Sequence, residues 1–478
     1  MKKIHFIGIG GSAMGSVAVA TAKAGYTVTG SDHGIYPPMS TVLEDAGIQW
    51  SNGYDAAALL KYEPDLIVVG NAISRGNPEL EAVLNHRLPF TSMSAFVGDT
   101  LIGRATSIVV TGTHGKTTTT SMASWILDAC GRQPGYLIGG VPSGLDGGCR
   151  PTMARDSVHA VFVSEGDEYD TAFFDKRSKF VHYRPTVAVI NNIEFDHADI
   201  FASLSDIKRS FQQLVRIVPS SGRILGNADD VNVLDVVHNA PCPVETVGYA
   251  EDATWRIVDE SYSGGSSKWY LRHGSATKGP FTVAMAGKHN IRNASMALIA
   301  AFAVGIPLHD AQHALERFTP PKRRLEHITT WHGRIVVDDF AHHPTAIAAT
   351  IRALRLQYPK SNLTVVFEPR SNTSTRNIFF SEFRECFDGA STVLFGPINR
   401  PERYDAAERL DTEALAADLQ KRGISAQALP TSVSGTPDWG SSVIPLLQGA
   451  TAPSDVIAIL SNGSVGGLRE MLIASQPT

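Results

Sequence analysis

Residues 107–118 read Ser-Ile-Val-Val-Thr-Gly-Thr-His-Gly-Lys-Thr-Thr, and this stretch decides the fold class. It begins with a short β-branched run, which predicts a buried strand. Beyond its glycine-bounded loop, apolar residues recur at helical spacing, and these are Met122, Trp125, Ile126 and Ala129. A strand, a glycine-rich loop and an amphipathic helix in this order predict a phosphate-binding loop in an α/β fold.

The loop residues have the chemistry that a bound nucleoside triphosphate requires. Backbone N–H groups of such a loop cradle the phosphates, a lysine neutralises the β- and γ-phosphate oxygens, and the next hydroxyl ligates Mg²⁺. Lys116 and Thr117 take these two positions, although the loop is shortened, because Val110 stands where the standard pattern has its first glycine. The alternative is a Lys-Thr pair that only begins a helix. We predict ATP and Mg²⁺ as ligands, and the predicted contacts are Gly112, Thr113, His114, Gly115, Lys116, Thr117 and Thr118.

A second glycine-rich turn, Gly8-Ile9-Gly10-Gly11-Ser12-Ala13, lies between the first apolar run and a helix-like stretch. With Asp32 at the end of the next run, it satisfies the G-x-G-x-x-G/A pattern of dinucleotide-binding folds. Such a turn lets a diphosphate approach the N-terminus of a helix, where free N–H groups favour anions. The pattern alone leaves open a dinucleotide, another diphosphate ligand or a turn without a ligand. The predicted ligand contacts are Gly10, Gly11, Ser12 and Asp32.

The 478 residues are about three times the length of a typical domain of ~150 residues. Short β-branched runs alternate with helix-like stretches, which is the pattern of parallel sheets with crossover helices. We place domain boundaries near residues 106 and 325, the second shortly after Pro320-Pro321, and predict three domains, 1–106, 107–325 and 326–478. The predicted strands are 4–9, 26–31, 66–70, 107–111, 160–163, 187–190, 334–337, 363–367, 392–395 and 456–460, and helices are predicted at 14–23 and 290–304.

Composition and charge are those of an ordinary globular protein, with 43% hydrophobic and 19% charged residues. A formal net charge of −5 gives no general attraction to nucleic acid or anionic lipid. The four cysteines, Cys130, Cys149, Cys242 and Cys386, show no metal-ligand spacing and are too few for a disulfide framework. The apolar run near the N-terminus is too short for a signal peptide or a bilayer span. We expect a cytoplasmic protein without nucleic acid, membrane or obligate protein partner.

Two predicted strands end near residues that suit a metal ion. Glu165 follows the run at 160–163, and His197 follows the run at 187–190. Because ligands of an open parallel sheet gather at the carboxyl ends of its strands, both side chains could face Lys116 and Mg²⁺. A solvated acidic loop and a structural histidine are the alternatives. The predicted metal ligands are therefore Thr117, Glu165 and His197.

Six motifs, spread over nearly the whole chain, resemble those of the Mur ligase family, the ATP-dependent enzymes that build the peptide of bacterial cell-wall precursors. They are Gly8-Ile9-Gly10-Gly11, Gly112-Thr113-His114-Gly115-Lys116-Thr117-Thr118, Asn192-Ile193-Glu194 with Asp196-His197, Gly287-Lys288-His289-Asn290 with Asn293, Arg323-Arg324, and Asp338-Asp339-Phe340-Ala341-His342-His343-Pro344-Thr345. The motifs follow the family order, so chance is a poor explanation. The resemblance is strongest to the members that act on UDP-N-acetylmuramate.

The resemblance implies an N-terminal Rossmann-like domain for the UDP-sugar, a central P-loop ATPase domain with a mostly parallel sheet, and a C-terminal Rossmann-like domain for the incoming amine. The first glycine turn would then hold the UDP diphosphate instead of a nicotinamide cofactor. Some family members carry a carbamoylated lysine, but the best-matching stretch here is Ser210-Phe211-Gln212-Gln213. That lysine is therefore expected to be absent.

The resemblance also implies residue roles. The adenine side of ATP would contact His289, Asn290 and Asn293, and the ribose would contact Asp338 or Asp339. Arg324 would approach the γ-phosphate across the gap between two domains. The implied catalytic residues are Lys116, Arg324 and His343.

The implied reaction converts the lactyl carboxylate of UDP-N-acetylmuramate to an acyl phosphate, which an amine then attacks. The amine is expected to be the tripeptide L-alanyl-γ-D-glutamyl-diaminopimelate, with free L-alanine as the alternative. Residues 167–183 are longer than the counterpart in the alanine-adding members, and Ser461-Asn462-Gly463-Ser464 also favours the tripeptide. Arg370 and Asn372 could supply directional donors to its carboxylates, although Arg370 could instead pair with Glu368.

Two other classes of function compete with this interpretation. An NAD-dependent oxidoreductase would use the first glycine turn but leaves Lys116 without a role. A nucleotide switch without catalysis would use the phosphate loop but leaves residues 338–345 without one. The ligase uses both.

Overall fold

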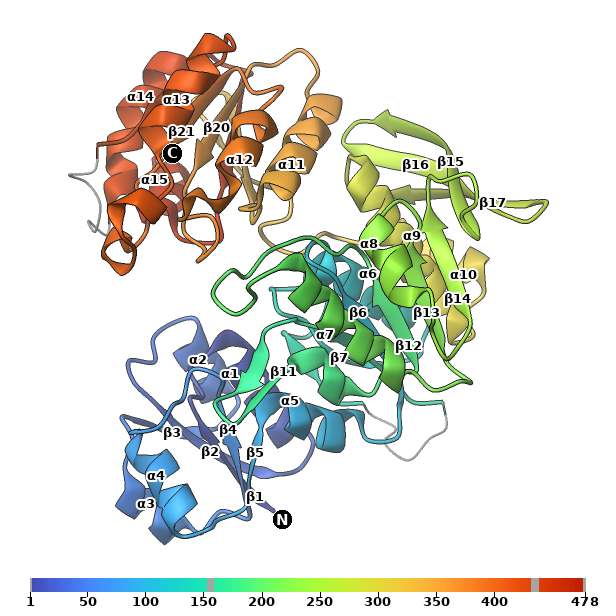
Figure 1. Ribbon diagram of the computed structural model, residues 1–478, viewed down its shortest axis with the longest axis vertical. Helices are drawn as coiled ribbons and strands as arrows, with labels where there is room; N and C mark the ends of the chain where they lie inside the picture. Colours follow the sequence, from blue (N-terminus) through green and yellow to red (C-terminus); the bar gives the residue numbers. More distant parts are fainter. Residues whose placement is uncertain (1, 153–158, 431–437, 476–478) are drawn as a thin grey trace.

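Three β-sheets organise the chain. The computed structural model describes residues 2–152, 159–430 and 438–475. In Figure 1 the N-terminal part, in blue, and the C-terminal part, in orange and red, both lie against the central part, in green and yellow. This arrangement leaves the carboxyl ends of the central strands facing both neighbours.

The first sheet has five parallel strands in the order β3-β2-β1-β4-β5. Its elements are β1 (Lys3–Ile7), α1 (Ser12–Lys23), β2 (Thr27–Asp32), α2 (Met39–Asp45), β3 (Gln49–Asn52), α3 (Ala56–Tyr62), β4 (Leu66–Val69), α4 (Pro78–Asn85) and β5 (Phe90–Ser92). The short helix α5 (Met93–Phe96) and the π-helical turn η1 (Val97–Ile102) then lead to the central sheet. The strand order reverses at β1, so the glycine turn after β1 lies at the point where such sheets bind ligands.

The central sheet has ten strands in the order β17-β16-β15-β14-β13-β12-β6-β9-β7-β8. Its strands are β6 (Thr106–Thr111), β7 (Gly135–Leu137), β8 (Cys149–Arg150), β9 (Val161–Glu165), β12 (Val187–Ile190), β13 (Arg223–Asn227), β14 (Val244–Gly248), β15 (Trp255–Ser263), β16 (Ser266–His273) and β17 (Ala276–Val283). The helices of this part are α6 (Lys116–Ala129), α7 (Leu204–Ile217), α8 (Val231–Val237), α9 (Lys288–Ala303) and α10 (Leu308–Leu315), with the 3₁₀ turn η2 (Lys179–Tyr183). A separate hairpin pairs β10 (Asp170–Ala172) with β11 (Asp175–Ser178).

The register of the central sheet places the site. Strand β6 lies between β9 and β12 and is parallel to both, with Val110 opposite Glu165 and Thr111 opposite Ile190. The phosphate loop after β6, the acidic stretch after β9 and the segment after β12 therefore leave the sheet at one edge. Strands β15, β16 and β17 are antiparallel, which the sequence analysis did not predict.

The third sheet has six strands in the order β18-β19-β23-β20-β21-β22, parallel except for the pair β18 and β19. Its strands are β18 (Glu326–Trp331), β19 (Arg334–Asp339), β20 (Leu363–Phe367), β21 (Thr392–Phe395), β22 (Ser425–Ala428) and β23 (Val456–Leu460). The helices are α11 (Pro344–Gln357), α12 (Phe380–Cys386), α13 (Thr412–Lys421), α14 (Val443–Ala450) and α15 (Leu468–Ala474). Short 3₁₀ turns are η3 (Asn377–Phe379), η4 (Pro401–Arg403), η5 (Ala406–Glu408), η7 (Trp439–Ser442) and η8 (Val465–Gly467).

Apolar packing joins the first two sheets more closely than it joins the third. One cluster contains side chains of the first sheet together with Phe96 and Leu101 of the connecting helices and Phe180 and Tyr183 of η2. The third sheet has two clusters of its own, one on each face. None of the helices in the described part of the chain has both the length and the apolar character that a bilayer crossing requires. The α/β class is confirmed, while the exact domain boundaries stay predictions.

Candidate functional site

A cavity of about 960 Å³ lies where the three sheets meet. Predicted site residues that line it are Ser12, Thr113, His114, Gly115, Lys116, Thr117, Thr118, Glu165, His197, His289, Asn290, Asn293, Arg324, Asp339 and His343. Predicted residues outside its lining are Gly10, Gly11, Asp32, Gly112, Asp338, Arg370 and Asn372. The structure thus brings together the predicted phosphate loop, the metal candidates and the adenine-side residues.

Two glycines give the phosphate loop its shape. Gly112 has φ +125°, and a Cβ there would lie 2.9 Å from the backbone nitrogen of Asn192. Gly115 has φ +80°, and a Cβ there would lie 2.5 Å from Oδ1 of Asn293. Helix α6 begins at the next residue, and its N-cap makes no side-chain hydrogen bond within the described residues. The first N–H groups of α6 are therefore available to an anionic ligand in the cavity.

Lys116 is held inside this loop. Its Nζ donates to the carbonyl oxygen of Gly112 at 2.7 Å and to Oε2 of Glu168 at 2.8 Å. Burial alone would lower the pKa of Lys116, but the carboxylates of Glu168 and Asp167 raise it above its ordinary value. The lysine therefore keeps its positive charge, which is what binding to phosphate oxygens requires.

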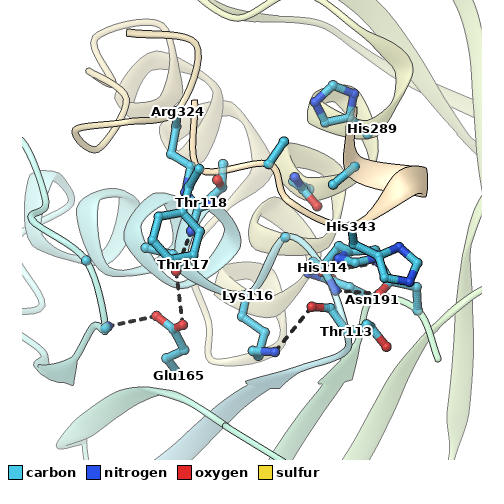
Figure 2. Close-up of a pocket in the computed structure, with 18 of the residues that line it drawn as sticks. Thr113, His114, Lys116, Thr117, Thr118, Glu165, Asn191, His289, Arg324 and His343 are labelled. Carbon is cyan, nitrogen blue, oxygen red and sulfur yellow. Dashed lines mark hydrogen bonds between the residues drawn. The ribbon is translucent and has the colours of Figure 1, made fainter. Parts of the chain in front are cut away.

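Thr117 connects the phosphate loop to two charged side chains. Its Oγ1 donates to Oε1 of Glu165 at 3.0 Å and accepts from Nη2 of Arg324 at 3.0 Å. The other oxygen of Glu165 accepts from the backbone nitrogen of Gly139 at 2.8 Å. Figure 2 shows Thr117 lying between Glu165 on one side and Arg324 on the other. An arginine next to the third sheet thus reaches the hydroxyl that is predicted to ligate the metal.

The second metal candidate, His197, lies nearest to a carboxylate that the sequence analysis passed over. Its Nε2 is 3.3 Å from Oε1 of Glu168, and Asp167, Glu168 and His197 offer ligand atoms within 4.8 Å of one another. Burial would raise the pKa of Asp167, but Lys179 and Lys116 lower it to about 2. Burial would likewise raise the pKa of Glu168, but Lys116 and His197 lower it overall.

These donors fit a hard divalent cation. Thr117 and Glu165 offer adjacent oxygen ligands, and Asp167 and Glu168 are ionised carboxylates at the same edge of the sheet. Mg²⁺ binds through a few carboxylates, hydroxyls and phosphate oxygens. The residues therefore suit Mg²⁺ bound together with a nucleotide phosphate.

The adenine-side candidates occupy the first turns of α9. Asn290 is buried and donates through Nδ2 to the carbonyl oxygen of Ala286 at 2.9 Å, which fixes the entry of the helix. Burial, together with nearby Arg292, lowers the pKa of His289 to about 4, so its ring is neutral near pH 7. Figure 2 places His289 on the far side of the phosphate loop from Glu165.

The two ribose candidates are buried and already hydrogen-bonded. Asp338 pairs with Nε of Arg469 at 2.8 Å and with Nε of Arg323 at 3.2 Å. Asp339 accepts from the backbone nitrogens of Leu325 at 2.8 Å and Ala341 at 2.9 Å. In this arrangement both carboxylates stabilise the start of the third sheet, and only Asp339 borders the cavity. Their contact with ribose stays a prediction.

His343, at the N-cap of α11, contacts the central part through two residues. Its Nε2 is 3.2 Å from the carbonyl oxygen of Phe195, and its Nδ1 is 3.6 Å from Oε2 of Glu194. His114 of the phosphate loop lies beside it, with ring centroids 4.7 Å apart. Burial, together with His114, lowers the pKa of His343 to about 4. A neutral ring with Nε2 protonated donates to the Phe195 carbonyl.

The N-terminal glycine turn has the shape of a diphosphate site. The backbone nitrogen of Gly10 donates to Oδ2 of Asp32 at 2.8 Å, and Tyr54 donates its hydroxyl to Oδ1 at 3.0 Å. Oδ2 of Asp32 therefore fixes the turn, while the hydroxyl of Tyr54 holds the other oxygen of the carboxylate. Helix α1 begins at Ser12, and its N-cap Gly11 makes no side-chain hydrogen bond within the described residues, which leaves backbone donors for a ligand.

The two peptide candidates have partners within the protein. Nη1 of Arg370 is 3.6 Å from Oε1 of Glu368, as the alternative interpretation anticipated. Nδ2 of Asn372 donates to Oδ2 of Asp199 at 2.9 Å, and Asp199 follows closely after His197. Both candidates lie in the loop after β20, at the edge that faces the central part.

Sequence reasoning assigned no site role to several residues that line the cavity. These are Asp167, Tyr169, Lys179, Asn191, Glu194 and Asp196. The signal was present for most of them, since they follow β9 and β12 directly. Only the folded chain decides which of several adjacent acids turns toward the cavity.

Comparisons with known proteins agree along the whole chain. Residues 3–104 match the description "Mur ligase family, catalytic domain", residues 110–301 match "Mur ligase middle domain", and residues 323–463 match "Mur ligase, glutamate ligase domain". The UDP-N-acetylmuramate--L-alanyl-gamma-D-glutamyl-meso-2,6-diaminoheptandioate ligase of Escherichia coli (strain K12) is 39% identical over 98% of this chain and 97% of its own. The UDP-N-acetylmuramate--L-alanine ligase of Acetivibrio thermocellus is 31% identical over 99% of this chain and 96% of its own.

Solved structures give the same picture. A murein peptide ligase from Psychrobacter arcticus 273-4 is 35% identical, with a TM-score of 0.70 over 99% of this chain and 98% of its own. The UDP-N-acetylmuramate:L-alanyl-gamma-D-glutamyl-meso-diaminopimelate ligase from Neisseria meningitides is 43% identical, with a TM-score of 0.63 over 68% of this chain and 100% of its own. A UDP-N-acetylmuramate-alanine ligase from Thermotoga maritima, 22% identical with a TM-score of 0.77, shares the fold.

Proposed function

This chain belongs to the Mur ligase family, and from that premise we propose that it joins the lactyl carboxylate of UDP-N-acetylmuramate to the amine of L-alanyl-γ-D-glutamyl-meso-diaminopimelate in an ATP-dependent reaction. One observation carries the proposal. Arg324, beside the third sheet, donates to Thr117 in the first turn of α6, where the phosphate loop ends. Two parts of the chain therefore meet where the γ-phosphate of ATP would lie. Full-length relatives at 37–39% identity carry the name of this reaction.

The first step makes the carboxylate reactive. A lactyl oxygen attacks the γ-phosphorus of ATP, the bond to the β–γ bridging oxygen breaks, and an acyl phosphate and ADP form. Lys116 and Arg324 stabilise the negative charge that spreads over the phosphoryl oxygens during this transfer. Mg²⁺ held by Thr117 and Glu165 would neutralise further phosphate charge. His197 and Glu168 lie at the same edge of the sheet and would provide a second set of metal ligands.

The second step forms the amide. The amine nitrogen attacks the acyl carbon, the carbon–oxygen bond to phosphate breaks, and inorganic phosphate leaves while the nitrogen loses a proton. An acyl phosphate also reacts with water, so the site must exclude water between the two steps. We propose that the C-terminal part closes over the cavity once ATP and the UDP-sugar are bound. An unchanged radius of gyration by small-angle X-ray scattering on adding both ligands would count against closure.

One experiment tests the reaction. Phosphate release from ATP is scored against a matrix of UDP-sugars and amine acceptors. We expect the fastest release with UDP-N-acetylmuramate and the tripeptide. Faster release with L-alanine would favour the alanine-adding reaction, which is the alternative. Reduction of NAD without use of ATP would favour the oxidoreductase.

A further inference from the structure

The segment that carries His197 is held by the C-terminal part on both sides. Before His197, the carbonyl oxygen of Phe195 is 3.2 Å from Nε2 of His343, and the ring of Phe195 lies 6.0 Å from that of Phe379. After His197, the backbone nitrogen of Ala198 donates to Oγ1 of Thr373 at 3.4 Å. The position of this metal candidate therefore depends on the third sheet as well as on the central one.

His197 is also in a backbone conformation that needs outside support. Its φ is +55°, in the left-handed region that residues other than glycine seldom adopt. Its carbonyl oxygen accepts from the backbone nitrogens of both Ile200 and Phe201 at 3.0 Å, so the turn beyond it is tight. A residue in such a conformation keeps it only where its surroundings fix it. A change in the conformation of this turn therefore changes the position of His197.

Asp199 is the residue of this turn that contacts the C-terminal part through its side chain. Its Oδ2 accepts from Nδ2 of Asn372 at 2.9 Å, and its Oδ1 accepts from the hydroxyl of Tyr169 at 3.4 Å. The ring of Tyr169 lies 4.3 Å from the ring of His197. Asp199 thus supports His197 twice, through the backbone of the turn and through the Tyr169 ring.

The partner, Asn372, stands on a braced loop. The backbone nitrogens of Arg370 and Ser371 both donate to Oγ of Ser374, at 3.1 and 3.0 Å, and Oγ1 of Thr375 donates to the carbonyl oxygen of Ser371 at 2.9 Å. A peptide carboxylate that replaces Glu368 as the partner of Arg370 therefore binds on this same short loop, two residues before Asn372. The hydrogen bond between Asn372 and Asp199 links the loop to the turn.

We propose that Asp199 and Asn372 are positioning residues that couple occupation of the peptide site to metal binding at His197. The inference rests on the proposed function. Coupling between two ligands is reciprocal, so a tripeptide that favours this arrangement must raise metal affinity by the factor by which the metal raises tripeptide affinity. Metal bound at His197 is then favoured when the amine substrate is present.

The test measures metal binding without turnover. Mn²⁺ stands in for Mg²⁺, and its binding is followed by electron paramagnetic resonance in protein with UDP-N-acetylmuramate and a non-hydrolysable ATP analogue, with and without tripeptide. The His197→Ala variant identifies the part of the signal that depends on His197. In the unaltered protein we expect the tripeptide to lower the Mn²⁺ dissociation constant about fivefold, at the low end of usual coupling factors.

An exchange of the two side chains gives the decisive comparison. Asn372→Asp places two carboxylates face to face, so the tripeptide effect on Mn²⁺ should disappear. The double variant Asp199→Asn with Asn372→Asp restores an amide–carboxylate hydrogen bond with its direction reversed, and the effect should return. Asn377→Asp is the matched control, because its side chain donates to the carbonyl oxygen of Ala407 within the C-terminal part. That variant should keep the full effect.

Each result decides between the proposals. Absence of the tripeptide effect in the unaltered protein, or its persistence in Asn372→Asp, overturns the coupling. Loss in Asn372→Asp without return in the double variant also overturns it and indicates direct contact of Asn372 with the peptide. If the unaltered protein does not ligate the tripeptide at all, the proposed function fails instead.

Discussion

Lys116 and Glu168 form an ion pair inside the protein, with Nζ 2.8 Å from Oε2 and the two side chains 13% and 2% exposed. The same carboxylate reaches His197 through its other oxygen at 3.3 Å. One buried acid therefore holds both the lysine of the phosphate loop and a metal candidate. An arriving nucleotide competes with Glu168 for Lys116, and a metal ion competes with Lys116 for Glu168.

Replacing Lys116 by Ala should reduce phosphate release ~10²-fold or more, because this charge faces the phosphoryl group in the transition state. Binding of UDP-N-acetylmuramate, followed by isothermal titration calorimetry, should remain, since the glycine turn of the first sheet is separate. The melting temperature should fall, because Glu168 keeps only His197 as a partner among its described ion pairs. Lys176→Ala, an exposed lysine on β11, is the matched control and should change neither rate nor melting temperature.

Replacing Arg324 by Ala should lower kcat ~10²-fold with little change in UDP-sugar binding, since its guanidinium lies at Thr117 and not near α1. Arg324→Lys should recover only part of the rate, because an ammonium lacks the planar donors of arginine. Steady-state kinetics of both variants provide the measurement, with the exposed Arg317→Lys as control. A normal kcat in Arg324→Ala would remove this residue from the catalytic group.

Replacing His197 by Ala should raise the Mg²⁺ concentration needed for half-maximal activity. The residue offers one ligand to the metal, but it also pairs with buried Glu168 at 3.3 Å and its ring lies 4.3 Å from that of Tyr169, so the melting temperature should fall as well. Titration of activity with Mg²⁺ checks the first expectation, and thermal unfolding checks the second. His313→Ala, at an exposed position on α10, should leave the titration unchanged. An unchanged titration in His197→Ala itself would return this histidine to a structural role.

The amine substrate should be the tripeptide, with free L-alanine used poorly or not at all. Arg370→Ala should reduce this preference. The arginine side chain is 38% exposed and pairs with Glu368 at 3.6 Å, so it can turn to a carboxylate of the peptide. The rates of UDP-product formation are compared at equal concentrations of both amines. Arg403→Ala, on the exposed turn η4, is the control. If L-alanine is the faster substrate, the peptide assignment is wrong.

Stability should fall as the pH drops from 6.5 toward 4. The pKa of His343 is about 4 in the folded protein and near 6.5 when unfolded, so the unfolded chain binds more protons between these values. The neutral histidine contributes fully above pH 6.5, and the loss is on the order of 1 kcal/mol for each pKa unit. Melting temperatures at pH 7 and pH 5 give the measurement. His343→Asn should narrow the difference between them, and the exposed His313→Asn should not.

The fold was predictable where the sequence pattern is local. The runs at 187–190, 363–367, 392–395 and 456–460 coincide with β12, β20, β21 and β23, because buried parallel strands are continuous β-branched segments. The antiparallel strands β15 and β16 were missed, although Gly264-Gly265 between two alternating runs is a hairpin signal. The alternation of apolar and polar residues in β15 and β16 is a weaker strand signal than the continuous apolar runs elsewhere in the chain.

The site was predictable as a set of strand ends and not as a set of contacts. The sequence places Glu165 and Glu168 in one acidic stretch, but only the fold shows that Thr117 donates to the former and Lys116 to the latter. Asp199 and Asn372 meet although 173 residues separate them. Such a contact leaves no periodicity or spacing in the sequence, so only the packed sheets bring it about.

The third sheet shares less apolar packing with the rest of the chain than the first two sheets share with each other, and this affects the heat capacity change of domain opening. The third sheet has its own clusters and meets the phosphate loop and the His197 turn chiefly through polar groups, with Phe195 as an apolar exception. Exposing apolar area raises the heat capacity and exposing polar area lowers it, so separating a small mixed contact gives little net change. Swinging the C-terminal part away should therefore have a heat capacity change near zero. Its open–closed equilibrium would follow a straight van't Hoff line, whereas unfolding of any of the three sheets would give a curved one.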